Sequence, residues 1–259
     1  MALSIDSLSV YLGGKEILKD GAMSFSVERG QVVGILGPNG CGKSTLLGSI
    51  GGLIEKSGGR ITVDDIDISA LKTRNRARIF SYVEQNERLS AAYTVLESVV
   101  MGRYPHLKSF ENYSAEDFGM ARSAIRRLSL DGFEKRLVTE LSGGESARVS
   151  IARALTQDAP VFLLDEPTAA LDPKHSLGVM RIARELAQDG KIVVAALHDI
   201  NLAMLSTDRL IFLKEGTIIS DRASKDVDGR ILEYVYDVPW ELFATGDGDR
   251  RVAFPVEEQ

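Results

Sequence analysis

One nine-residue segment constrains this chain more than any other feature of its sequence. Residues 37–45 have the order Gly-Pro-Asn-Gly-Cys-Gly-Lys-Ser-Thr, which follows the spacing G-x-x-x-x-G-K-S of a phosphate-binding loop. The glycines allow a tight turn in which successive backbone N–H groups can point at phosphate oxygens, and the loop opens a helix whose positive end favours anions. An apolar run at 31–36 predicts the strand that must precede such a loop. The pattern therefore predicts a nucleotide site built on a strand–loop–helix unit.

The members of this loop have distinct expected roles. Lys43 is expected to reach the β- and γ-phosphates, and the hydroxyl of Ser44 to bind Mg²⁺. The other nucleotide-binding positions are those that shape the loop, namely Gly37, Pro38, Asn39, Gly40, Cys41, Gly42 and Thr45. Cys41 is the only cysteine, so no intramolecular disulfide can form, and we interpret it as a small filler residue.

The order of apolar segments indicates an α/β fold. Apolar runs at 161–164 and 192–197 are typical of strands buried on both faces of a mainly parallel sheet, whereas the alternating pattern near 3–10 indicates an antiparallel part at the N-terminus. Between these regions, about 86–156, the pattern becomes helical. We expect one domain over 1–259 with a helical insertion at about 86–156 and a short polar tail at about 240–259.

Bulk composition excludes several classes of protein. The chain has 259 residues and a net charge of −6, so no global basic field attracts nucleic acid. No apolar stretch approaches the length of a membrane span, and the first residues lack the pattern of a signal peptide. We therefore expect no membrane crossing by this chain itself.

A second acidic element follows the strand at 161–164. Asp165 and Glu166 come at its carboxyl end, where ligands bind in parallel α/β sheets. Because side chains alternate along a strand, the two carboxylates point in different directions. Asp165 is expected to hold Mg²⁺, and Glu166 to polarise the attacking water.

The segment Leu141-Ser142-Gly143-Gly144-Glu145 resembles the signature of ATP-binding-cassette (ABC) ATPases. The resemblance implies a P-loop NTPase core of the RecA-like kind with a helical subdomain. It also implies that Ser142, Gly143 and Gly144 close over ATP held by the phosphate loop of a second copy of the chain.

Other residues fall in the order of the same family. By resemblance Tyr11 stacks on adenine, Asp172 lies in the loop that crosses the dimer interface, and His198 contacts the γ-phosphate. Gln85 by resemblance senses Mg²⁺, couples to the membrane partner, and belongs with the catalytic and metal-binding residues. Asp172 can also cap the helix that follows it, and His106 and His175 are interpreted as surface residues. The sequence departs from the family at Glu84, where proline is usual, and at Ser146, where glutamine or arginine is common.

Residues 93–106 resemble a T-V-x-x-x-V-x-x-G-R-x-P-H segment of import ATPases for iron-siderophore, haem and cobalamin. The resemblance implies an ATPase that drives import of such cargo, most directly iron-siderophore, as a homodimer bound to membrane permease subunits at the cytoplasmic face. An extracytoplasmic binding protein would act indirectly.

Other functions remain open from the sequence. They are an ATPase of another importer class, an exporter subunit, a nucleic-acid-linked ABC ATPase, a phosphate-loop kinase or GTPase, and a cassette that binds ATP without cleaving it. The signature argues against a kinase or GTPase, and the absence of a heptad run argues against the nucleic-acid-linked class.

Overall fold

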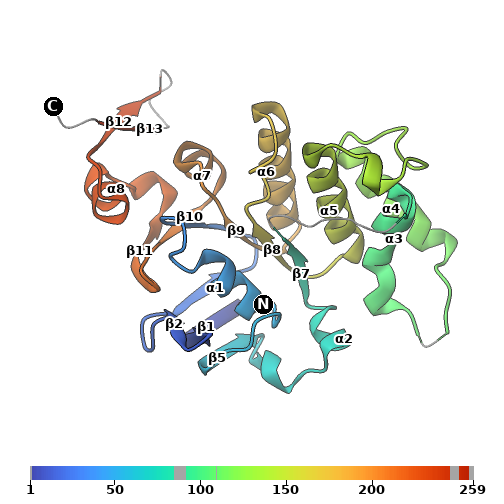
Figure 1. Cartoon of the computed structure of the whole chain (residues 1–259), viewed down its shortest axis with the longest axis horizontal. Helices are drawn as coiled ribbons and strands as arrows, with labels where there is room; N and C mark the ends of the chain where they lie inside the picture. The colour runs from blue at the N-terminus through green and yellow to red at the C-terminus, as the bar shows by residue number, and fades with distance from the viewer. Residues whose placement is uncertain (1, 85–91, 109, 246–250, 257–259) are drawn as a thin grey trace. The chain divides into compact units, whose positions relative to one another are not determined.

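The computed structural model describes residues 2–84, 92–108, 110–245 and 251–256 (Figure 1). The chain divides into two compact units, one formed by Met1–Ala70 with Ala183–Gln259 and the other by Leu71–Ile182. The first unit contains an antiparallel sheet, four strands of a mainly parallel sheet and a two-stranded sheet, and the second contains two parallel strands and a set of helices. Each unit has its own arrangement of elements.

An antiparallel sheet forms the N-terminal part of the first unit. Its strands are β1 (Ala2–Leu12), β2 (Lys15–Leu18), β3 (Phe25–Glu28), β5 (Gly58–Val63) and β6 (Ile66–Asp67). β1 pairs with β2, β3 and β5, and the alternation that predicted it buries Leu3 and Ile5 on one face. The sheet packs against helix α1 (Lys43–Ile50), as the blue elements of Figure 1 show.

The remaining strands of the first unit have the order β11-β10-β4-β9. They are β4 (Val32–Leu36), β9 (Ile192–Ala196), β10 (Arg209–Lys214) and β11 (Thr217–Ala223). β4 lies parallel to both neighbours, and every residue of β4 and β9 is buried. This burial explains why both strands are continuous apolar runs rather than alternating ones. Helices α7 (Ile200–Ser206) and α8 (Gly229–Tyr236) complete this part.

The expectation of a polar tail near the C-terminus was wrong for most of that segment. Strands β12 (Trp240–Ala244) and β13 (Arg251–Pro255) form an antiparallel pair, and β13 contacts α7. The side chain of Asn201 bonds both backbone groups of Ala253, with its amide nitrogen 3.1 Å from the carbonyl and its oxygen 2.7 Å from the N–H nitrogen. Strands β12 and β13 are therefore paired with each other, and β13 is held to α7 by a contact that spans 52 residues.

The second unit combines β7 (Phe80–Val83) and β8 (Val161–Asp165), which are parallel, with a group of helices. Its helical elements are α2 (Thr73–Arg76), α3 (Val95–Val100), the 3₁₀ turn η2 (Met101–His106), α4 (Ala115–Arg127), the 3₁₀ turn η3 (Val138–Glu140) and α5 (Gly143–Gln157). Helices α3, α4 and α5 pack on one another (Figure 1), and their buried residues include Val99, Ile125 and Val149. Helix α6 (Pro173–Gln188) begins in this unit and continues into the first one.

The helical subdomain expected from the sequence is thus present. Within the described ranges, no helix combines the length and the apolar character needed to cross a bilayer.

Candidate functional site

The phosphate-binding loop connects β4 to α1, as the sequence predicts. Gly40 and Gly42 have φ values of 76° and 109°, in the region that glycine adopts without a steric penalty. Gly37 is required for another reason, because a Cβ atom there would lie 2.1 Å from the carbonyl oxygen of Leu213. The loop is therefore shaped by backbone conformation at two positions and by close packing at the third.

Lys43 begins α1 and is 5% exposed, so its ammonium group is held inside the loop. Its Nζ atom lies 2.8 Å from the carbonyl oxygen of Gly37 and 3.2 Å from that of Pro38. An ammonium has three N–H donors, so these two bonds do not exhaust its capacity to bind an anion. The first N–H groups of α1 and this charge together make the loop a site for phosphate oxygens.

His198 is brought close to the phosphate loop by strand register. Ile35 of β4 pairs with Ala196 of β9, and the N–H of Leu197 donates to the carbonyl oxygen of Ile35 at 3.0 Å. His198 and Gly37 each follow two residues after this pair, so they occupy the same level at the carboxyl edge of the sheet. His198 is exposed there, and the next residue, Asp199, caps α7 by accepting from the N–H of Leu202 at 2.9 Å.

Tyr11 lies near the end of β1, in the sheet that packs on α1, and its side chain is half exposed. Its pKa is raised above the usual value, first by the hydrogen bond to the Glu16 carboxylate and then by the charge of that group. The phenol therefore stays neutral, and its ring is accessible for stacking.

In the second unit, Asp165 ends β8 and is 3% exposed. The hydroxyl of Tyr82 donates to its Oδ2 atom at 3.2 Å. Burial, followed by the charge of Asp165, raises the pKa of Tyr82, so the phenol remains a donor. Sequence reasoning assigned Tyr82 no functional role.

Glu166 follows immediately and is also buried, with a φ of 51° that is uncommon for a residue other than glycine. Its carbonyl oxygen accepts from the N–H of Ala169 at 3.2 Å, so the chain turns sharply after β8. The two carboxylates consequently differ in backbone geometry as well as in strand position. This difference is compatible with separate tasks for the two groups.

The signature segment forms the capped start of α5. The hydroxyl of Ser142 accepts from the N–H of Glu145 at 3.3 Å, and the carboxylate of Glu145 accepts from the N–H of Ser142 at 2.7 Å. This reciprocal pair is a capping box. Ser142 and Gly143 are exposed, so the positive end of the helix lies at the protein surface.

The structure places the signature beside the segment that contains Asp172. A Cβ atom on Gly144 would lie 3.1 Å from the carbonyl oxygen of Ala170, so the glycine permits this approach. Asp172 also caps α6, since its Oδ1 accepts from the N–H of His175 at 2.9 Å and its Oδ2 lies 2.9 Å from the His175 ring. The capping role expected for Asp172 is therefore observed.

The histidine interpretations need a correction. His106 is half-buried, and its Nε2 atom lies 2.8 Å from the carbonyl oxygen of Gln157. His175 is also partly buried against Asp172. Neither is a simple surface residue. Gln85 lies outside the described residues, and Glu84 before it is exposed.

The predicted site residues thus fall into two groups. The phosphate loop, His198 and Tyr11 belong to the first unit, whereas Asp165, Glu166, the signature and Asp172 belong to the second. Each group is assembled by contacts within its own unit.

Comparisons with known proteins identify the family in which a phosphate loop and this signature occur together. The sequence profile of the ABC transporter family matches residues 21–169. The chain belongs to the ABC transporter family.

Several relatives of this cassette are import proteins. A cobalamin import ATP-binding protein of Halobacterium salinarum is 40% identical over 228 residues, which cover 88% of this chain and 56% of that protein. The cassette thus spans little more than half the length of that relative. A hemin import ATP-binding protein of Streptomyces coelicolor is 40% identical over 91% of this chain and 83% of its own length. A petrobactin import ATP-binding protein of Bacillus subtilis is 31% identical over 91% of this chain and 93% of its own length.

Solved structures give the same family. A metal-chelate type ABC transporter in an inward-facing conformation superposes with a TM-score of 0.84 at 28% identity, covering 99% of this chain and 97% of that one. A dimeric cassette bound to ADP and phosphate has a TM-score of 0.78 at 30% identity, covering 87% of this chain and all of that one. The ABC ATPase fold expected from the sequence is confirmed, and the cassette is of the ATP-binding type.

Each unit contains an oxygen ligand of the type that Mg²⁺ binds in proteins. Within the described ranges, no cluster of three or more His, Cys, Asp or Glu side chains could hold a metal ion by itself. Mg²⁺ in nucleotide sites is typically bound by one or two protein oxygens together with substrate phosphates and water. The buried carboxylate of Asp165, kept in place by Tyr82, is an oxygen ligand of that kind in the second unit, and the hydroxyl of Ser44 is one in the first unit.

Proposed function

We propose that this cassette is the ATP-hydrolysing subunit of an ABC importer. One observation carries the proposal: a single chain presents both a phosphate loop with a buried lysine and an exposed, capped helix start at Ser142 and Gly143. Both elements are suited to bind phosphate oxygens. A chain with two such elements is suited to pair head to tail with a second copy, in which each nucleotide lies between a loop and a signature.

The chemistry assigned to each residue follows from its surroundings. Lys43 and the loop amides neutralise the charge that develops on the β- and γ-phosphates. Ser44 and Asp165 would hold Mg²⁺, which supplies further charge neutralisation when bound. Glu166 orients the attacking water and accepts its proton. His198 donates to the γ-phosphate from the adjacent strand.

The partner copy completes the site. Ser142, Gly143 and Gly144 donate to the γ-phosphate, and Asp172 lies at the interface. Tyr11 stacks on adenine, and Gln85 couples Mg²⁺ to the permease. The dimeric relative bound to ADP and phosphate supports this arrangement.

For the cargo, we propose a metal chelate of the iron-siderophore, haem or cobalamin class. The Gly-Arg-x-Pro-His segment at 102–106 and the cobalamin, hemin and petrobactin import relatives support that class. The preference for iron-siderophore within the class stays a prediction. The cassette would act on a permease dimer at the cytoplasmic face of the membrane, fed by an extracytoplasmic binding protein.

The test of hydrolysis and pairing is the variant Glu166→Gln. It keeps the size of the side chain and removes the base, so we expect ATP binding to persist, turnover to fall by at least 100-fold, and an ATP-dependent dimer to accumulate in size-exclusion chromatography. Lys43→Met serves as the control that loses ATP binding. Parental turnover in the Glu166→Gln chain would contradict the assigned role, and turnover by a strict monomer would contradict pairing. Co-purification with a candidate permease, followed by stimulation of turnover with chelate-loaded binding protein, tests the cargo class.

A further inference from the structure

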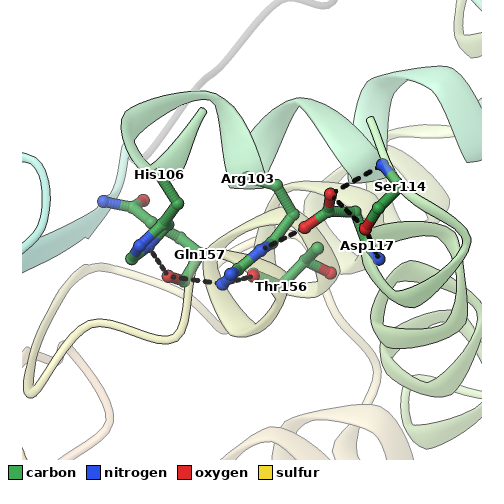
Figure 2. A network of polar contacts seen from close by, with 6 residues as sticks. All are labelled: Arg103, His106, Ser114, Asp117, Thr156 and Gln157. Atoms are coloured by element: carbon green, nitrogen blue, oxygen red, sulfur yellow. Dashed lines mark hydrogen bonds and ion pairs between the residues drawn. The ribbon is translucent and has the colours of Figure 1, made fainter. Parts of the chain in front are cut away.

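The short turn η2 is fastened to the last turn of the signature helix α5. The Nε2 atom of His106 lies 2.8 Å from the carbonyl oxygen of Gln157, and the guanidinium of Arg103 lies 3.3 Å from that of Thr156 (Figure 2). These carbonyls are among the four at the end of a helix that have no partner within it. Arg103 also places a positive charge at the negative end of the helix dipole. The residue types at 103 and 106 are therefore explained by the end of α5.

Arg103 connects this helix end to α4. Its Nε atom lies 2.9 Å from Oδ1 of Asp117, and Ser114 donates to the other carboxylate oxygen through its N–H and its hydroxyl, both at 2.8 Å (Figure 2). Burial alone would raise the pKa of Asp117, but the bond from Ser114 N–H and the Arg103 guanidinium outweigh it and hold the pKa below its usual range. The ion pair thus links the start of α4 to the end of α5.

Gln157 extends the same contacts to strand β7. Its side-chain nitrogen lies 2.5 Å from the carbonyl oxygen of Ala77 and 2.8 Å from that of Phe80. The hydroxyl of Ser81 lies 3.2 Å from the Gln157 side-chain oxygen and 3.0 Å from the carbonyl oxygen of Ala154. The beginning of β7 and the end of α5 are therefore fixed to one another through one glutamine.

The approach of η2 to α5 leaves no room for a side chain at its second residue. A Cβ atom on Gly102 would lie 2.3 Å from the carbonyl oxygen of Arg153 and 3.0 Å from the backbone nitrogen of Gln157. Gly102, Arg103 and His106 thus act together, the first by allowing contact and the other two by bonding across it.

We propose that Arg103, His106 and Gln157 are positioning residues that hold the last turn of the signature helix, Gln157 by bonding strand β7 and Arg103 and His106 by bonding η2 to α5, so that movement of β7 is passed to Ser142 and Gly143. The proposal rests on the proposed function, in which the signature must meet nucleotide held by a second copy. A helix of 15 residues is about 22 Å long, so a tilt of about 5° at its fixed end moves the other end by about 2 Å. A displacement of that size separates a bonded from an unbonded phosphate contact.

The first experiment measures amide hydrogen exchange in the nucleotide-free full chain. Arg103→Met removes the charged bonds, and we expect exchange to rise about tenfold or more both in the last turn of α5 and at Ser146 and Ala147 in its first turns. Ile125→Val, which shortens a buried side chain of α4, is the control that lowers stability and leaves intact the clamp, by which we mean the bonds of Arg103, His106 and Gln157 at the end of α5. A rise confined to the last turn, or an equal rise in the control, would show that the contact is only local and would overturn the proposal.

A pair of variants tests His106 separately. His106→Gln keeps an N–H donor that can reach the carbonyl of Gln157, whereas His106→Leu does not. We expect parental exchange in the first and the Arg103→Met pattern in the second. Equal behaviour of the two variants would exclude a bonding role for His106.

The second experiment connects the clamp to catalysis. In Arg103→Met we expect kcat to fall about tenfold with little change in the Kd of a fluorescent ATP analogue, because the phosphate loop is untouched. A loss of ATP affinity equal to the loss of kcat would overturn the positioning role. If the parental chain itself did not hydrolyse ATP, the proposed function would fail, while the exchange experiment would still decide whether the clamp links the two ends of α5.

Discussion

Adding one methyl group to the signature separates its effect on the stability of a single chain from its effect on ATP turnover by the proposed dimer. In Gly143→Ala the new Cβ atom meets no heavy atom within 4 Å, and the residue already has helical backbone at the start of α5. Alanine favours a helix over glycine by up to about 1 kcal/mol. The single chain should therefore become more stable by up to about 1 kcal/mol. The same methyl would stand over the helix start that the proposed dimer sets against the phosphate of nucleotide held by a second copy.

The assay compares unfolding in urea with ATP turnover. Loss of one preorganised donor to a developing charge typically costs a factor of about 100 or more, so we expect kcat to fall by about that amount while stability rises. Gly119→Ala is the matched control, because Gly119 also lies in a helix with nothing within 4 Å of an added Cβ, but on α4. It should gain stability and keep turnover. Parental turnover in Gly143→Ala would refute the reasoning, and lower stability would show that the surroundings of this glycine are crowded.

Three other perturbations test separate parts of the cassette. Lys43→Met should raise the Kd of ATP, measured by equilibrium titration, by more than about 100-fold, because it removes the buried ammonium from the loop. The N–H of Ser142, and after it the Ser142 hydroxyl, lowers the pKa of Glu145 in the folded chain. The Glu145 carboxylate therefore stabilises the fold at pH values above its unfolded pKa of about 4.3, and this stabilisation is lost as the pH falls through the lower pKa of the folded chain. Between about pH 6 and pH 3, the free energy of unfolding in urea should therefore fall less in Glu145→Gln than in the parental chain. The same dependence of this free energy on pH in both chains would contradict the assignment. Asn201→Ala should release β13 from α7, because it removes both bonds to the backbone of Ala253. We expect faster proteolysis after residue 240 and a loss of about 1–3 kcal/mol in the free energy of unfolding. Equal proteolysis of the variant and the parental chain would show that the Ala253 contact is dispensable.

Local signals made the fold and the phosphate loop predictable. Gly40 and Gly42 adopt the left-handed conformation that the loop spacing requires, and the fully buried runs of β4 and β9 became parallel strands. The need for Gly37 was not visible in the sequence, because it comes from the carbonyl of Leu213, far along the chain. Nine consecutive residues identify the phosphate loop, but they do not reveal which distant residues pack against it.

The elements that sequence reasoning missed depend on distant contacts. In the sequence, β12 and β13 are separated by residues 246–250, whose composition is that of a polar tail, and the pair is anchored by the side chain of Asn201. His106 had no visible partner because it bonds a backbone carbonyl 51 residues away. Side-chain types alone do not reveal which orphan carbonyl at a helix end a distant residue will satisfy.

The internal bonds of the signature explain why it would bind phosphate only as half of a composite site. Glu145 places a carboxylate at the positive end of α5 and occupies the N–H of Ser142 at 2.7 Å, while Arg136 lies 3.3 Å from that carboxylate. A phosphate approaching this end alone would meet a donor already in use and a negative charge only partly offset. Lys43 supplies a buried positive charge in the other element, so in the proposed dimer ATP would gain full neutralisation only where the loop of one copy and the signature of the other both bind it. Closure would therefore depend on the γ-phosphate, and its loss on hydrolysis would weaken both halves at once.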